Sequence, residues 1–92
     1  MEFEWDEEKN KINIQKHGIA FEDALKVFLD PYRVYFYDSA HSSIQEERWQ
    51  TIGCAFSNIL FVIYTFRDEK EIYRIISARK ANAREKRKYY QG

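Results

Sequence analysis

Hydrophobic residues recur along this chain first with a helical period and later with a strand-like period. Residues 3–5, Phe-Glu-Trp, fit either a short strand or a packed lead-in. Asp6 is placed to cap a helix that Gly18 ends, because a carboxylate accepts the free N–H groups at a helix start and glycine readily adopts the left-handed conformation after its end. A second helix should stop near Leu29, since Pro31 has no backbone N–H to continue it. Its apolar face consists of residues three or four positions apart, Phe21, Ala24, Leu25 and Phe28.

Apolar and β-branched residues then form four strand-like runs, at residues 33–38, 47–56, 59–66 and 71–78. Short connections join most of them and predict antiparallel neighbours. Gly53 predicts a break or bulge in the second run. We therefore expect an α+β fold in a single domain over the whole chain. It should contain two N-terminal helices, a four-stranded, mainly antiparallel sheet and a C-terminal helix.

Residues 67–92 combine that final helix with most of the positive charge. The helical period begins after residue 79, with Asn82 as the N-cap and Glu85 as its reciprocal partner. Nine Lys and Arg against four Asp and Glu give residues 67–92 a net charge of +5, whereas residues 1–30 carry −4 and residues 31–66 carry −1. The total of zero therefore describes a dipolar molecule with a basic end.

Several classes of protein are excluded by what the sequence lacks. It has no apolar run of about eighteen residues and starts with an acidic segment, so we expect no membrane partner, no signal peptide and a cytoplasmic location. Cys54 is the single cysteine, which excludes an internal disulfide and suggests a small core residue. No Cys/His cluster has zinc-ligand spacing, so we predict no metal and no other cofactor.

Three arginines near the C-terminus, Arg67, Arg74 and Arg79, are the main candidates for chemistry. Strict alternation along the last strand places Arg74 among isoleucines on the face of Ala78, and Ser77 with Arg79 on the other face. A guanidinium in an apolar setting needs an anion, so Arg74 either binds substrate or forms a structural ion pair with an N-terminal acid. Arg79 stands at a strand-to-helix junction, where free helix N–H groups favour the same phosphate.

Other candidates each have a plain structural alternative. His17 suits proton transfer near neutral pH and Lys16 precedes it, but both also suit a helix C-terminus. His41 in a loop is a weaker candidate. Arg48 and Trp49, at the start of a strand, fit substrate binding. The structural alternative is a salt bridge at the rim for Arg48 and a place in the core for Trp49. Two further substrate-binding candidates are Ser77 and Arg84.

Eight short motifs occur here in the same order as in the BrnT family of bacterial toxins, and the chain resembles that family over nearly its whole length. The resemblance implies a RelE-like fold, a small antiparallel sheet with helices packed on it. It also implies a ribonuclease that inhibits translation, and a BrnA antitoxin with a ribbon-helix-helix DNA-binding domain; the complex would bind and repress its own promoter. The motifs are Phe3-Glu4-Trp5-Asp6, Lys16-His17-Gly18, Phe21-Glu22-Asp23-Ala24, Asp30-Pro31, Glu46-Glu47-Arg48-Trp49, Ile52-Gly53, Tyr64-Thr65-x-Arg67 and Arg74-Ile75-Ile76-Ser77-Ala78-Arg79.

Three positions depart from the family pattern. Phe66 stands where the family often has Glu, so no acid at this position can serve as a general base. Ala20 replaces a common Ser or Thr before the second helix. Asn82 replaces a usual Thr, which is an equivalent helix cap. The first departure affects the mechanism and leaves the family resemblance intact.

The leading hypothesis is a metal-independent endoribonuclease in which the 2′-hydroxyl of the RNA attacks the adjacent phosphate. Arg67, Arg74 and Arg79 would stabilise the charge that develops on that phosphate. His17 or Lys16 would move a proton, with Glu47 as a less favoured base. Two alternatives stay open: a non-catalytic binding module that acts only as co-repressor with a DNA-binding partner, and a fold whose N-terminal acids neutralise its C-terminal cations.

Overall fold

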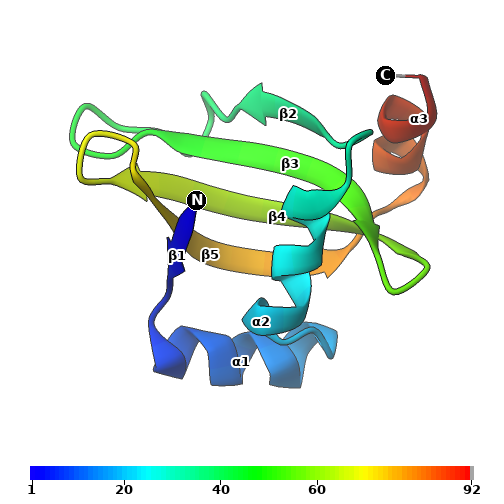
Figure 1. Ribbon diagram of the computed structural model, residues 1–92, viewed down its shortest axis with the longest axis horizontal. Coiled ribbons are helices and arrows are strands. Elements are labelled where there is room, and N and C mark those ends of the chain that lie inside the picture. The colour runs from blue at the N-terminus through cyan, green and yellow to red at the C-terminus, as the bar shows by residue number, and fades with distance from the viewer. Residues whose placement is uncertain (92) are drawn as a thin grey trace.

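A computed structural model describes residues 1–91 and consists of one five-stranded sheet with helices on both of its faces (Figure 1). The elements are the strands β1 (Glu2–Glu4), β2 (Val34–Tyr37), β3 (Arg48–Ala55), β4 (Asn58–Arg67) and β5 (Ile72–Lys80), the helices α1 (Glu7–His17), α2 (Phe21–Ala24) and α3 (Ala83–Gln91), and the 3₁₀ helix η1 (Leu25–Leu29).

The sheet has the strand order β1-β5-β4-β3-β2, in which β1 is parallel to β5 and the other neighbours are antiparallel. The expected α+β class is confirmed, whereas the expected four strands are wrong, because β1 adds a fifth and makes the sheet mixed. The sequence left residues 3–5 open between a short strand and a packed lead-in, because so short a segment is not decided by alternation, and the structure has the strand. Long-range packing holds β1 in place, since the centre of the Phe3 ring lies 5.0 Å from the centre of the Phe28 ring and 5.5 Å from that of the Tyr73 ring.

The predicted helix ends of α1 are confirmed. The Asp6 carboxylate accepts the N–H groups of Glu8 and Lys9, and Gly18 has a φ of 71° while its N–H donates to Ile14. The second helix is less regular than expected. It begins as the short α2 and continues as η1, which ends at Leu29 as the following proline predicts.

The two faces of the sheet differ in how they are covered. On the helix-covered face, α1, α2 and η1 bury the main core, whereas α3 covers only one end of the opposite face, here called the open face (Figure 1). The Asn13 side chain of α1 donates to the Ala78 carbonyl at 2.8 Å and accepts the Ala78 N–H at 3.1 Å. It thereby satisfies the edge of β5 beyond the point where β1 ends.

A β-bulge in β5 decides which side chains reach the open face. Ile63 pairs with Ser77 and Tyr64 pairs with Ile75, so Ile76 is an extra residue. Ile75 and Ala78 are consequently both buried on the helix-covered face although they lie three positions apart. The strict alternation expected from the sequence is wrong here, because the bulge puts Arg74 on the same face as Ser77 and Arg79.

Gly53 has a packing role and does not mark a bulge. β3 runs unbroken through it, contrary to the expected break. A Cβ at this position would lie 2.8 Å from Val27 Cγ1 and 3.2 Å from the Val27 carbonyl oxygen. Glycine therefore lets η1 pack directly against the backbone of β3.

Candidate active site

Strand pairing arranges the open face in rows that run across β3, β4 and β5. One row contains Arg48, Thr65 and Arg74, the next contains Gln50, Ile63 and Ser77, and a third contains Ile52, Phe61 and Arg79. Paired residues in an antiparallel sheet have Cβ atoms about 5 Å apart and point to the same face. The first and third rows thus place guanidinium groups on either side of the middle row.

This middle row forms the floor of a hollow of about 310 Å³, here called the open-face hollow. It is bounded by β3, β4, β5 and the loop after β2. Three of the predicted site residues, Arg48, Ser77 and Arg79, come together there. The complete lining is Asp38, His41, Arg48, Gln50, Phe61, Ile63, Ile76, Ser77 and Arg79.

Arg79 is held rigidly at one side of the open-face hollow. Its two terminal nitrogens donate to the two oxygens of Glu85 at 2.8 and 2.9 Å, and its guanidinium carbon lies 4.3 Å from the centre of the Phe61 ring. Glu85 also accepts the Asn82 N–H at 3.0 Å, while the Asn82 side chain accepts the Glu85 N–H at 2.9 Å. The predicted reciprocal cap of the last helix is therefore confirmed, and it fixes the arginine as well.

The same contacts govern the ionisation of Glu85. Burial alone would raise the pKa of this carboxyl, but the hydrogen bonds from Arg79 and Asn82 and the nearby positive charges of Arg79 and Lys88 outweigh it and lower the pKa below its ordinary value. Glu85 consequently stays ionised and keeps the guanidinium in place.

Arg48 approaches from the other side and retains unused donors. Its Nε donates to Glu46 at 3.0 Å, while neither terminal nitrogen makes a hydrogen bond to any residue in the range 1–91. The backbone around it is tied to the loop after β2, because Ser42 Oγ accepts the Arg48 N–H at 2.8 Å and donates to the Asp38 carbonyl at 2.7 Å. Arg48 and Asp38 are thereby fixed relative to each other.

His41 enters the open-face hollow together with a buried carboxylate. Its Nδ1 lies 3.0 and 3.1 Å from the two oxygens of Asp38, whose side chain is only 3% exposed. The imidazole itself is largely exposed. His41 was only a weak candidate in the sequence, and Asp38 was not singled out. The feature that could have indicated the pair is an Asp and a His three positions apart in the turn that follows a strand.

Lys16 and His17 line a second, smaller hollow of about 170 Å³ at the end of α1. Ile76 and Ser77 border both hollows. The bulge residue and its neighbour therefore connect the end of α1 to the open-face hollow.

Arg67, Arg74 and Arg79 do not converge on one pocket. Of the three, only Arg79 lines the open-face hollow. Arg67 Nη2 lies 3.6 Å from Glu46 Oε2, and Arg74 forms an ion pair with Glu4 of β1. The structural alternative for Arg74, an ion pair with an N-terminal acid, is thus the arrangement found. Among the six ion pairs of residues 1–91, it is the one that joins the acidic first part of the chain to its basic last part.

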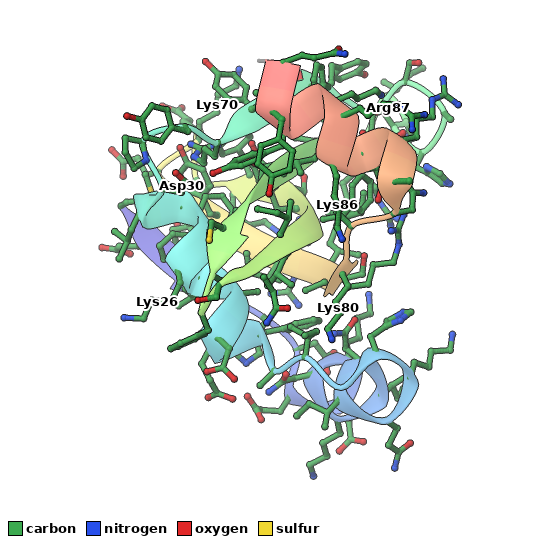
Figure 2. The ribbon with its side chains drawn as sticks, turned by 90° about the vertical axis from the view of Figure 1, so that its right-hand side faces the viewer. Lys26, Asp30, Lys70, Lys80, Lys86 and Arg87 are labelled. Carbon is green, nitrogen blue, oxygen red and sulfur yellow. The ribbon has the colours of Figure 1, made fainter. Side chains whose placement is uncertain are left out.

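Two other predicted residues lie elsewhere. Trp49 points to the helix-covered face, because successive strand residues alternate, and so it is separated from Arg48 by the sheet. Arg84 is exposed on α3 and does not line the open-face hollow. It belongs to the cationic end of the molecule, where Figure 2 shows Lys80, Lys86 and Arg87.

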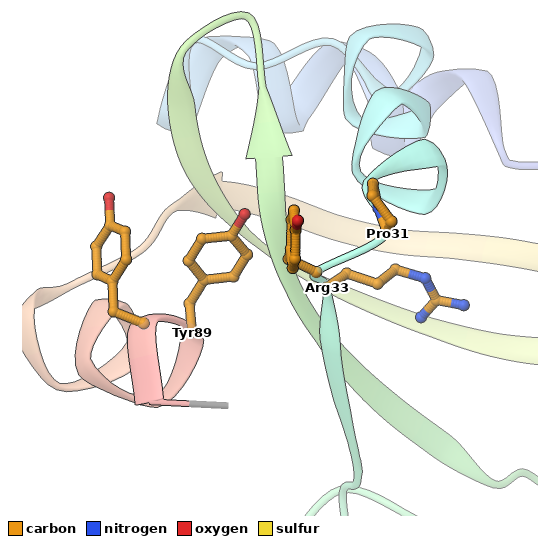
Figure 3. Close-up of a pocket in the computed structure, with 5 residues that line it drawn as sticks. Pro31, Arg33 and Tyr89 are labelled. Carbon is orange, nitrogen blue, oxygen red and sulfur yellow. The ribbon is translucent and has the colours of Figure 1, made fainter.

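A further hollow, of about 470 Å³, lies between α3 and the segment after η1 (Figure 3). The polar contacts beside it have a structural role. The Tyr89 hydroxyl donates to Asp30 at 2.6 Å, and Asp30 also accepts the Cys54 N–H at 2.8 Å. The hydrogen bond to this carboxylate, followed by burial, raises the pKa of Tyr89 well above its ordinary value. These contacts dock α3 on β3, and Arg33 points away from Tyr89.

Within residues 1–91, no three His, Cys, Asp or Glu side chains are grouped so as to hold a metal ion. None of the helices in the described part of the chain is long and apolar enough to cross a membrane.

Comparison with known proteins agrees with the resemblance of the motifs. No curated protein matches the chain. A protein-family profile described as "Ribonuclease toxin, BrnT, of type II toxin-antitoxin system" matches residues 5–85. Such systems pair a toxin with an antitoxin, so the family implies an RNA target and an antitoxin partner. Because the match covers most of its 92 residues, this chain belongs to the BrnT family of ribonuclease toxins.

Proposed function

We propose that this toxin is a metal-independent endoribonuclease that cleaves RNA in the cytoplasm and so inhibits translation, with the open-face hollow as its active site. One observation carries the proposal. The Asp38–His41 pair, Arg48 and Arg79 line the same hollow, which combines a group suited to proton transfer with two that bind phosphate. Proton transfer and charge neutralisation are the two tasks that RNA cleavage by its own 2′-hydroxyl requires.

In the proposed reaction, His41 Nε2 takes the proton of the 2′-hydroxyl while Asp38 holds Nδ1 and thereby fixes the ring orientation. The 2′-oxygen bonds to phosphorus, and the bond from phosphorus to the 5′-oxygen breaks. The departing oxygen takes up a proton. The products are a 2′,3′-cyclic phosphate and a 5′-hydroxyl end.

Arg48 and Arg79 bind the reacting phosphate in this scheme. The free terminal nitrogens of Arg48 supply donors directly, and Glu85 pre-orients Arg79. Ser77 provides a hydroxyl on the floor between them. Arg67 and Arg74 lie along the same face but outside the hollow, so we assign them to flanking phosphates.

The proton for the departing 5′-oxygen comes from Lys16 or His17, which lie across Ser77 from the open-face hollow. Glu47 is a poor choice for a base, because its carboxylate accepts the Trp49 indole N–H at 3.4 Å and Trp49 lies on the opposite face. Arg84 on α3 is left for contacts with the RNA backbone outside the hollow.

We further infer that the antitoxin is of the BrnA type, with a ribbon-helix-helix domain, and that the complex binds operator DNA through it and represses its own promoter. The type II family supports the antitoxin, and the exposed cations of α3 support an acidic docking segment.

A non-catalytic co-repressor is the second candidate function. The observation that favours it is that Arg67, Arg74 and Arg79 each already have a carboxylate partner. This candidate requires the purified protein to leave RNA intact.

Expression with and without the antitoxin distinguishes the two functions. Wild type should arrest growth and degrade RNA when expressed alone, whereas Arg48→Gln should be about 10² to 10³ times slower in cleavage and harmless. Arg87→Gln, an exposed arginine on α3 outside the hollow, is the matched control and should remain toxic. Equal harmlessness of wild type and Arg48→Gln would overturn the ribonuclease proposal.

A further inference from the structure

The helix-covered face carries another hollow, of about 260 Å³, beyond the end of η1. It is here called the aromatic hollow. Four adjacent strands contribute aromatic rings to it, with Tyr35 from β2, Trp49 from β3, Tyr64 and Phe66 from β4, and Tyr73 from β5. Its lining is Arg33, Tyr35, Trp49, Tyr64, Phe66, Lys70 and Tyr73.

Two cations border this aromatic floor. The guanidinium carbon of Arg33 lies 5.1 Å from the centre of the Phe28 ring and 5.2 Å from that of Tyr35, and Nη1 donates to Thr51 at 3.2 Å. Lys70 Nζ lies 5.9 Å from the centre of the Phe66 ring. Both positive charges are therefore held over aromatic faces.

Within the described part of the chain, the two cations of the aromatic hollow have no directly paired carboxylate. No carboxylate lines the hollow, and neither Arg33 nor Lys70 forms an ion pair with any residue from 1 to 91. This distinguishes them from Arg67, Arg74 and Arg79, which all have acidic partners. The hollow thus fits an anion that also presents a flat apolar surface.

We propose that the aromatic hollow stacks an unpaired base of the RNA strand, while Arg33 and Lys70 contact its phosphate. Single-stranded RNA offers both features, a planar base and a phosphate within one nucleotide of each other, and is commonly bound by rings and cations in combination. The inference rests on the proposed function only in taking RNA as the ligand. It adds a binding site on the sheet face opposite to the open-face hollow.

The edge strand β2 provides a path between the two hollows. Within residues 1–91 no strand pairs with its outer side, and its three aromatic residues are exposed. Tyr35 and Tyr37 lie on the face of the aromatic hollow, whereas Phe36 pairs with Gln50 and lies on the open face. An RNA strand that passes around β2 would meet aromatic rings on both sides of the sheet.

The test measures binding of a 2′-O-methyl RNA hexamer, which lacks the attacking hydroxyl, to the full chain by fluorescence anisotropy. Tyr35→Ser should weaken binding by about 5- to 150-fold, the loss typical of one stacked base. Lys70→Gln should reduce the slope of log affinity against log salt by about 0.7, the share of one phosphate contact. Both residues are exposed, so these variants should fold.

Two matched controls remove a similar group elsewhere. Tyr90→Ser removes an exposed tyrosine of α3, and Lys26→Gln removes an exposed lysine that Figure 2 shows apart from Lys70. Both should bind the hexamer like wild type. Unchanged affinity and salt slope in Tyr35→Ser and Lys70→Gln would overturn the proposal. So would a loss that affects only binding of the antitoxin, because the hollow would then be a protein-docking surface.

A separate variant distinguishes failure of this site from failure of the proposed active site. His41→Ala should bind the hexamer like wild type but fail to cleave unmodified RNA. If His41→Ala cleaves normally while Tyr35→Ser loses affinity, the active-site assignment is wrong and the stacking site stands.

Discussion

His41 and Asp38 form a pair in which imidazole Nδ1 lies 3.0 and 3.1 Å from the two carboxylate oxygens, at the rim of a hollow that also contains Arg48 and Arg79. Asp38 is buried and tied by its backbone to Arg48, so the imidazole is attached to a fixed point of the sheet. In the proposed mechanism, this pair supplies the group that moves a proton beside two arginines that bind phosphate.

Replacement of His41 tests that role. His41→Ala should lower the rate of RNA cleavage by about 10² to 10⁴, the usual contribution of general acid–base catalysis. Because the ring is largely exposed, the melting temperature should remain close to that of wild type. Cleavage rates and thermal unfolding of the same preparation check both statements. An undiminished rate would show that another group takes the proton.

Glu85 should make stability depend on acidity. Its pKa is lower in the folded protein than its ordinary value of 4.5, so its contribution is complete above that value and is lost as the pH falls through the folded pKa. Melting temperatures between about pH 7 and pH 3 should therefore fall more steeply in wild type than in Glu85→Gln. At neutral pH the variant should be less stable by about 1 kcal/mol. Parallel curves for the two proteins would contradict the pairing with Arg79.

Tyr89 should ionise only at unusually alkaline pH. Because its pKa is raised, its hydrogen bond to Asp30 contributes fully below the ordinary value of 10 and is lost as the pH rises through the folded pKa. Ultraviolet titration should show one fewer late-ionising tyrosine in Tyr89→Phe than in wild type. The late step that remains belongs to Tyr64, whose pKa burial raises despite the neighbouring Arg33.

Gly53→Ala should destabilise the fold without changing any residue that lines the open-face hollow. The added methyl group would meet Val27 Cγ1 at 2.8 Å and the Val27 carbonyl at 3.2 Å, so η1 would have to shift. Overpacking of this kind typically costs about 1 to 3 kcal/mol. Urea unfolding measures the loss, and Gly18→Ala is a useful comparison, since there the strain comes from a φ of 71° and not from a neighbour.

The local features of this fold could be predicted from the sequence, whereas its long-range pairings could not. Asp6, Gly18 and the Asn82–Glu85 cap act through residues within a few positions, so their spacing is sufficient. The strand β1 and the bulge at Ile76 depend on partners about seventy and thirteen residues away, respectively. Strict alternation therefore assigned Arg74 to the wrong face.

The candidate site shows the same division. Arg48, Ser77 and Arg79 could be proposed as residue types suited to RNA, but only the register of β3, β4 and β5 brings them to one hollow. Arg67 and Arg74 were also main candidates in the sequence, but they lie outside this hollow and pair with Glu46 and Glu4. Trp49 and Arg48 lie on opposite faces of the sheet, because adjacent residues of a strand point to opposite sides.

The chemistry of the RNA ends tests the central claim most directly. Purified wild type should cleave RNA in the presence of excess EDTA and leave 2′,3′-cyclic phosphate and 5′-hydroxyl ends, with His41→Ala inactive under the same conditions. These ends result only if the 2′-hydroxyl of the substrate is the nucleophile. Products with 5′-phosphate ends, or cleavage that stops when EDTA is added and resumes with a divalent cation, would contradict an active site built from Asp38, His41, Arg48 and Arg79.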